Sequence, residues 1–89
     1  MDSTKNTGPV EVWLRQDNMK VTCTVVKEDE TTYELDVDSL SMRGAQREIT
    51  GAFLADGYGA AGRWEVEAAD EAMGGSPLET VRRFRPTKS

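Results

Sequence analysis

Apolar and polar residues alternate along three stretches in the first half of the chain, at residues 10–15, 19–25 and 33–38. A period of two predicts β-strands, because successive side chains of a strand point to opposite faces of the sheet. The polar segments between these stretches, residues 16–18 and 27–30, favour tight turns. The first half of the chain is therefore predicted to form a three-stranded meander.

The period then changes to steps of three and four residues, over about residues 41–56. This spacing places the apolar side chains on one face of a helix. Ser39 or Ser41 can cap the start of this helix, because a serine hydroxyl accepts a hydrogen bond from a free backbone N–H. Gly57 suits the left-handed residue that commonly follows a helix, and Tyr58 can fold back on the last turn. We predict one amphipathic helix that ends at Gly57.

Two more strands are predicted after the helix, at residues 63–68 and at about residues 78–85. The segment between them, residues 70–77, reads as a long flexible connection because it is polar and rich in glycine. The last strand departs from simple alternation, since Val81 and Phe84 fall on opposite faces. We therefore expect either a bulge in that strand or burial of both its faces.

The predicted order βββαββ defines a small α+β domain, with an antiparallel or mixed sheet and one helix packed on one face. The chain has 89 residues, which is too few for a second hydrophobic core. We assign residues 10–86 to this domain, residues 1–9 to a flexible N-terminal leader and residues 87–89 to a flexible C-terminal end. The strand order stays open, because the fourth strand can neighbour the first or the third.

Charge is distributed unevenly along the chain. The content of 37% hydrophobic and 30% charged residues is typical of a globular protein, and the formal net charge is -5. Residues 80–89 carry four basic residues and no acid, whereas residues 1–79 carry seven basic and sixteen acidic residues, a net charge of -9. The main part of the chain should repel phosphate backbones, so any contact with nucleic acid must be local.

Residue types exclude several kinds of site. The chain has no histidine and one cysteine, Cys23, so it cannot form a Cys/His zinc site, an internal disulfide or a Ser-His pair. Cys23 alternates with Val21 and Val25 and is expected to be a small buried hydrophobe. The N-terminus has no apolar run typical of a signal peptide, and no stretch reaches the roughly twenty apolar residues of a membrane span. We expect a soluble cytoplasmic protein without metal or cofactor.

Motifs for catalysis are equally sparse. Residues 57–62, GYGAAG, match the dinucleotide-binding pattern of glycines, but they follow a predicted helix and precede a strand, which reverses the order that pattern needs. We interpret them as the loop that ends the helix. The acidic run at residues 27–30 lacks the spacing of a calcium loop. Paired carboxylates need a pocket to act in catalysis, and the domain is too small to enclose one. We therefore predict that the protein is not an enzyme.

Two features remain as candidates for binding. The first is the outward face of the sheet, where an exposed tryptophan stands among acidic residues, as in the anchor of a protein interface. The predicted protein-binding residues are Trp13, Glu34, Asp36, Glu65 and Glu67. The alternative for Trp13 is a structural one, in which it covers the sheet edge or packs against Phe84. An exposed sheet edge offers a second mode of docking.

The second feature is the basic C-terminal segment, with Arg82, Arg83, Arg85 and Lys88. These side chains can pair with acidic residues of the same sheet, or they can bind a partner. We predict a noncatalytic protein-interaction module, acting as a small regulator, inhibitor or adaptor, with self-association into a homodimer as one option. The alternative is a nucleic-acid-binding accessory protein that uses the basic segment. Size and composition have the general look of small phage or bacterial accessory proteins, but no motif assigns a family.

Overall fold

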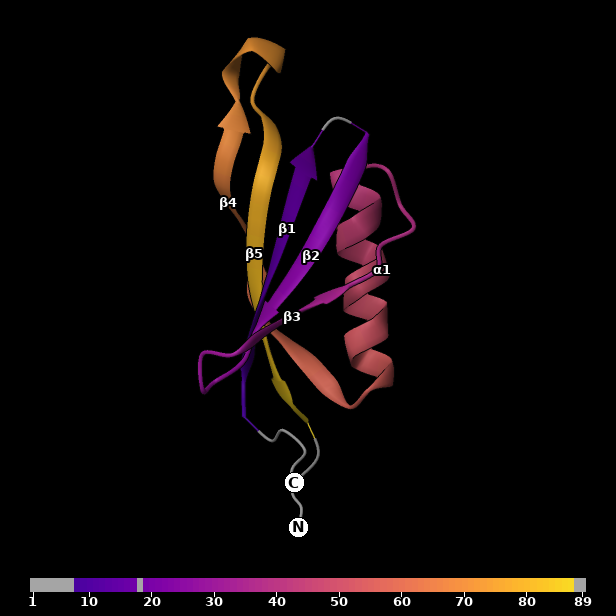
Figure 1. The fold of residues 1–89 in the computed structure, drawn as a ribbon, viewed down its shortest axis with the longest axis vertical. Coiled ribbons are helices and arrows are strands. Elements are labelled where there is room, and N and C mark those ends of the chain that lie inside the picture. The colour runs from indigo at the N-terminus through magenta and orange to yellow at the C-terminus, as the bar shows by residue number, and fades with distance from the viewer. Residues whose placement is uncertain (1–7, 18, 88–89) are drawn as a thin grey trace.

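The βββαββ order predicted from the hydrophobic pattern is the order of the computed structural model, which describes residues 8–17 and 19–87 (Figure 1). The elements of this part of the chain are β1 (Val10–Asp17), β2 (Lys20–Val26), β3 (Thr32–Leu35), α1 (Met42–Ala55), β4 (Tyr58–Asp70), the 3-10 helix η1 (Glu71–Met73) and β5 (Ser76–Pro86). Residues 1–7 of the predicted leader and 88–89 of the predicted C-terminal end lie outside the described residues. Among those described, no helix is both long and apolar enough to cross a membrane.

All pairings between the described strands are antiparallel, and the strand order is β3-β2-β1-β5-β4. The predicted meander of the first three strands is confirmed. Neither neighbour considered for the fourth strand is correct, because β5 pairs with β1 and β4 pairs with the far side of β5. The chain therefore passes from one edge of the sheet to the other through α1.

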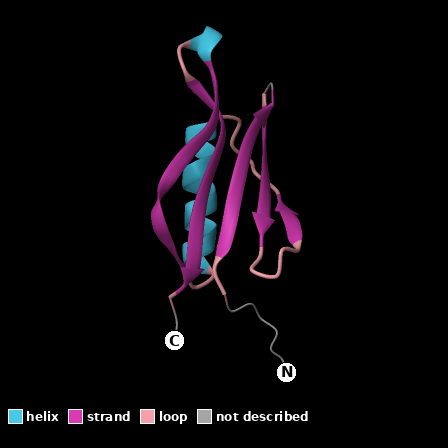
Figure 2. Ribbon diagram, turned by 90° about the vertical axis from the view of Figure 1, so that its left-hand side faces the viewer, coloured by secondary structure: helices cyan, strands magenta, loops and turns pink. Residues whose placement is uncertain are grey.

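The hydrophobic core lies between α1 and one face of the sheet (Figures 1 and 2). Its buried residues are Val10, Val12, Leu14, Val21, Cys23, Val25, Met42, Ala45, Ile49, Phe53 and Phe84. Every second residue is buried in β2 and, as far as Leu14, in β1, which accounts for the alternation seen in the sequence. Full burial of one large aliphatic or aromatic side chain stabilises the fold by roughly 1.5–3 kcal/mol. Met19, predicted on the apolar face of the second strand, instead lies in the turn before β2 and is 73% exposed.

The predicted ends of the helix are confirmed. The Ser41 hydroxyl accepts a hydrogen bond of 3.1 Å from the Gly44 N–H, so Ser41 is the N-cap. Gly57 follows the helix with a φ of 87°, a conformation that favours glycine. The Tyr58 ring packs edge-on against Phe53 in the last turn, with 5.4 Å between ring centroids. These contacts turn the chain directly from α1 into β4.

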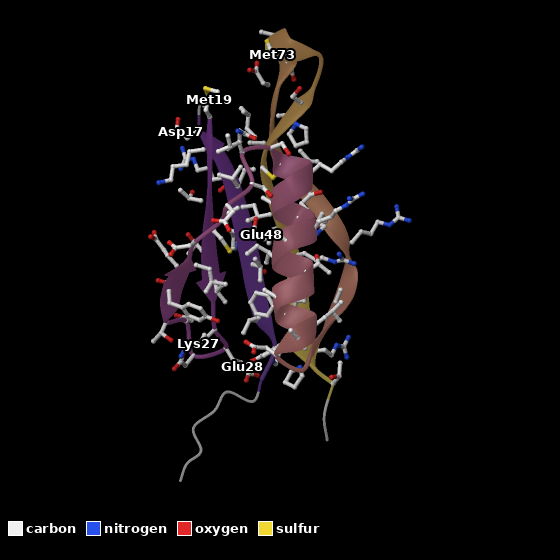
Figure 3. All side chains as sticks on the ribbon, turned by 90° about the vertical axis from the view of Figure 1, so that its right-hand side faces the viewer. Asp17, Met19, Lys27, Glu28, Glu48 and Met73 are labelled. Atoms are coloured by element: carbon white, nitrogen blue, oxygen red, sulfur yellow. The ribbon has the colours of Figure 1, made fainter. Side chains whose placement is uncertain are left out.

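Glu48 attaches the middle of α1 to the segment that follows β3 (Figure 3). Its carboxylate accepts hydrogen bonds from the backbone N–H groups of Asp38 and Ser39, both at 3.0 Å, and from the Ser39 hydroxyl at 3.1 Å. These backbone hydrogen bonds hold the pKa of Glu48 below its ordinary value, although partial desolvation opposes them. The ionised carboxylate thus fixes the connection between β3 and α1.

The last two strands are longer than predicted. β4 begins at Tyr58 rather than at residue 63, so the loop predicted for residues 57–62 is mostly strand. The long connection predicted for residues 70–77 is a hairpin turn, because Asp70 pairs with Ser76 and η1 fills most of the distance between them. This hairpin extends past the rest of the sheet (Figure 1).

A bulge in β4 changes which side chains face the helix. Ala61 pairs with Arg83 and Glu65 pairs with Val81, so residues 62–64 of β4 all oppose the single residue Arg82. Trp64 packs against the core through this bulge. Further register shifts occur between Val66 and Ala69. Val81 and Phe84 are both buried although they face opposite sides of the sheet, as the sequence indicated.

Gly51 offers a test of how the helix is stabilised. A Cβ atom added there would meet nothing within 4 Å, so Gly51→Ala should raise the free energy of unfolding by about 0.5–1 kcal/mol, the difference in helix propensity. Gly44→Ala is the matched control, because its Cβ would lie 2.9 Å from the Ser39 hydroxyl oxygen and crowding should offset the gain. Urea denaturation measures both variants. Equal stabilisation by the two substitutions would contradict this account.

The hydrogen bonds of Glu48 predict a pH dependence. A carboxyl group whose pKa is lower in the folded state stabilises the fold above its unfolded pKa, about 4.3 for glutamate, and loses this effect as the pH falls through the folded pKa. The difference in free energy of unfolding between wild type and Glu48→Gln should therefore be largest near neutral pH and shrink in acid. Denaturation series across pH 2–7 would test this, and a difference that is constant with pH would contradict it.

Candidate functional site

The face of the sheet opposite α1 is the open face: no other described element covers it (Figure 2). One row of directly opposed residues crosses all five strands there. From β3 to β4 the row consists of Glu34, Thr24, Trp13, Val81 and Glu65. Side chains in such a row are close enough to interact. The apolar residues Trp13 and Val81 stand at its centre, with polar residues at both ends.

Trp13 is held in place by its neighbours rather than lying free on the surface. Its indole N–H donates a hydrogen bond of 3.0 Å to one oxygen of Glu11, which lies two residues earlier on the same face of β1. The other oxygen of Glu11 accepts from Arg83 at 3.4 Å. Trp13 is half-buried, and Val81 beside it is 9% exposed. A fixed, partly exposed ring loses little conformational entropy on binding, which suits an interface anchor.

A hollow of about 310 Å³ opens between Trp13 and the bulge of β4. Its lining residues are Glu11, Trp13, Ala61, Gly62, Arg63, Glu65, Glu67, Val81, Arg82 and Arg83. Three of them are acidic and three are arginines, so the formal charge of this lining is zero. We call this site the mixed-charge hollow. It can accept an apolar side chain between groups of both charges.

The residues predicted for protein binding are only partly brought together. Trp13, Glu65 and Glu67 line the mixed-charge hollow. Glu34 lies on the same face, two strands away from Trp13. Asp36 follows the end of β3 and is not among the residues that line the hollow. The acidic face expected from the sequence is thus balanced by arginines near Trp13.

Much of the basic C-terminal segment makes internal contacts. The Nε and Nη2 atoms of Arg82 donate to the Gly62 carbonyl oxygen at 3.1 and 2.7 Å. Its guanidinium also lies 5.9 Å from the ring centroid of Trp64. Arg83 pairs with Glu11, Arg85 is exposed, and Lys88 lies outside the described residues. Arg83 therefore makes an internal ion pair of the kind considered from the sequence, a weak one because Arg83 is exposed, whereas Arg82 is held by a backbone carbonyl oxygen rather than by an acidic residue.

Sequence reasoning missed Glu11, Arg63 and Val81 as members of the site. The position of Glu11, two residues before Trp13, was a usable signal because the two side chains share one face of a strand. The bulge that brings Arg63 to the hollow depends on the pairing of β4 with β5, which no local pattern gives.

The described residues contain no group of three or more His, Cys, Asp or Glu side chains that could hold a metal ion. The Cys23 thiol is buried in the core, and burial, with the nearby charges of Glu34 and Glu48, raises its pKa to about 11. A thiol is nucleophilic only when deprotonated. Cys23 therefore acts as a core side chain, as its position in the sequence suggested.

Comparison of the chain with protein-family models, with curated proteins and with solved structures gives no match. Function is therefore inferred from the residues and their geometry.

The state of Cys23 can be tested directly. In the folded protein at pH 8 the thiol should react far more slowly with a disulfide reagent such as DTNB than a free thiol does, because it is both protonated and shielded. The same protein unfolded in guanidinium should react at the ordinary rate. Rapid modification without loss of the folded circular dichroism spectrum would show that Cys23 is accessible and would contradict the packing described here.

Proposed function

We propose that this protein is a noncatalytic interaction module, a small regulator, inhibitor or adaptor, that docks on a partner protein through the open face of its sheet. One observation carries the proposal: Trp13 and Val81 lie together beside a hollow of about 310 Å³, on a face that no described element covers. Tryptophan is enriched among residues that dominate binding energy, particularly when polar groups surround it. The partner is expected to place an apolar side chain against Trp13.

The charges around Trp13 would orient that partner. Glu65 and Glu67 provide negative charge from β4, while Arg63 and Arg83 provide positive charge in the same hollow. Complementary charges at an interface raise the association rate and disfavour wrong partners more than they raise affinity. The matching surface should therefore carry both charges around an apolar centre. A second copy of the chain is one candidate partner, which would give a homodimer.

Docking through the face is favoured over docking through a sheet edge. One edge strand, β3, has only four residues. The other, β4, is interrupted by a bulge at residues 62–64 and by further register shifts. Short and bulged strands are the features that hinder pairing with an added strand. The sheet edge is therefore the weaker candidate for a docking surface.

The contacts of the basic segment give nucleic-acid binding less support than protein binding. Arg82 is held by Gly62, and Arg83 is paired with Glu11. Phosphate binding would compete with the Arg83–Glu11 pair and with the net negative charge of the chain. We place the protein in the cytoplasm, where the buried free thiol of Cys23 stays reduced.

The experiment uses the purified protein as bait in a lysate of the source organism, with and without nuclease treatment, and retained proteins are quantified by mass spectrometry. Wild type is compared with Glu65→Arg, which reverses a charge in the mixed-charge hollow. The matched control is Glu71→Arg, the same change at an exposed position in η1, at the tip of the β4–β5 hairpin. We expect one protein to be retained by wild type and control, and at least about tenfold less of it by Glu65→Arg.

Two results would reject docking through this face. One is retention that Glu65→Arg and Glu71→Arg reduce equally, since the effect would then follow net charge rather than position. The other is retention that disappears with nuclease, which would favour the basic segment and its phosphate contacts. Light scattering on the purified protein at several concentrations shows whether the retained protein is a second copy of the chain.

A further inference from the structure

A second hollow, of about 530 Å³, lies on the helix side of the sheet between α1 and the bulge of β4. Its lining residues are Arg43, Gln46, Arg47, Thr50, Gly51, Leu54, Trp64 and Arg82. Three are arginines, and none of these described lining residues is acidic. We call this site the basic groove. It differs in charge from the mixed-charge hollow, although Arg82 lines both.

The arginines converge on the groove from two elements. Arg43 and Arg47 are four residues apart and therefore lie on the same side of α1, where both are exposed. Arg82 comes from β5, and its guanidinium is fixed by two hydrogen bonds to the Gly62 carbonyl oxygen. Figure 3 shows nitrogen-bearing side chains on the side of α1 next to β4, whereas oxygen-bearing side chains gather near β3. The helix thus has a basic side.

Apolar surface lies within the same groove. Leu54 is 57% exposed, and Trp64 is half-buried beside Phe84. Gly51 leaves space between α1 and its surroundings, since a Cβ atom there would meet nothing within 4 Å. A single exposed leucine on a helix is common and does not by itself indicate a binding site. Here Leu54 lines a groove with three arginines, which defines a site with both apolar and basic contacts.

We infer that the basic groove binds a short acidic segment of a partner protein, in which carboxylates flank an apolar side chain. The carboxylates would pair with Arg43, Arg47 and Arg82, because a guanidinium matches a carboxylate with two parallel hydrogen bonds. The apolar side chain would cover Leu54 and Trp64. Apart from Arg82, which lines both hollows, the site lies away from the open face, so a single domain has two surfaces that differ in charge.

A peptide fits this groove better than a nucleic acid does. A polyphosphate chain long enough to be held firmly would run over the rest of the protein, and residues 1–79 carry a net charge of -9. Sequence-tolerant binding of single strands depends on bases stacking on aromatic rings. The Arg82 guanidinium already lies 5.9 Å from the Trp64 ring centroid, so a base would have to displace it to stack on that ring. The exposed Leu54 is better matched by an aliphatic side chain than by a phosphate.

The test uses isothermal titration calorimetry on the full chain with three probes. The first is a blocked peptide in which glutamates flank one leucine, the second replaces those glutamates with glutamines, and the third is a single-stranded DNA oligonucleotide. We expect saturable binding of the acidic peptide alone. Binding should weaken as salt rises, because the contacts are between exposed charges.

Three variants locate the binding. Arg47→Glu should weaken it by about tenfold or more, since it removes one charged contact and adds repulsion. Arg85→Glu makes the same change of charge on an exposed residue outside the groove and should leave the affinity within about twofold of wild type. Gly51→Leu keeps every charge but fills the space beside α1, and it should abolish binding. Thermal unfolding checks that each variant stays folded.

The inference fails if the acidic and neutral peptides bind alike, or if neither binds. It also fails if Arg47→Glu and Arg85→Glu weaken binding equally, because the chain would then act only through its net charge. Binding that survives Gly51→Leu would place the peptide elsewhere. Binding of the oligonucleotide in place of the peptide would assign the groove to nucleic acid.

Discussion

The aromatic ring of Phe84 in β5 joins three elements of this fold, because it contacts both α1 and β4. Its side chain is fully buried, and its ring stacks on Phe53 in α1 with 4.8 Å between centroids. The same ring meets Trp64 of β4 edge-on at 6.2 Å, and Phe53 in turn contacts Tyr58 at the start of β4. Aromatic pairs with this geometry contribute beyond the area they bury. One residue of β5 therefore joins the helix, the turn after it and the edge strand.

The bulge at residues 62–64 accompanies this arrangement and shapes both proposed binding surfaces. It lets Trp64 reach Phe84 on the helix side while Glu65 returns to the open face opposite Val81. It also presents the Gly62 carbonyl oxygen to the Arg82 guanidinium. Residues of the bulge line the mixed-charge hollow, and Trp64 with Arg82 lines the basic groove. A single irregularity in one strand thus supplies walls to sites on both faces.

The sequence predicted the parts of the fold where one face is buried and the other meets solvent. β1, β2 and α1 have that contrast, so their periods were visible, and Ser41 and Gly57 marked the ends of the helix. β4 begins with glycines and alanines that differ little in hydropathy, and its bulge shifts the alternation. β5 buries Val81 on one face and Phe84 on the other, which obscures any period. The strand order depended on pairings across the chain that no local pattern contains.

The candidate sites were predictable to a similar extent and for related reasons. Trp13 could be placed on the open face because β1 alternates strictly, but the arginines that offset its acidic neighbours come from β4 and β5. Arg43 and Arg47 were overlooked although their spacing of four residues is a local signal for one side of a helix. The groove that they line could not be predicted, because its third arginine, Arg82, comes to lie beside them only when the sheet is formed. Local patterns indicated which side chains are exposed, and tertiary pairing determined which of them act together.

The fixed position of Arg82 helps to explain how so small a domain can present two proposed binding surfaces. A domain of this size has room for only one core, and that core occupies the space between α1 and the sheet. Its remaining polar groups must lie on the surface, where a long side chain is ordinarily mobile and gives up entropy when it binds. Arg82 is already ordered by two hydrogen bonds to Gly62 and by its position over two aromatic rings. Trp13 is ordered in the same way by Glu11. Both proposed surfaces therefore contain a side chain that is already fixed, which would lower the entropic cost of binding a partner without a larger core.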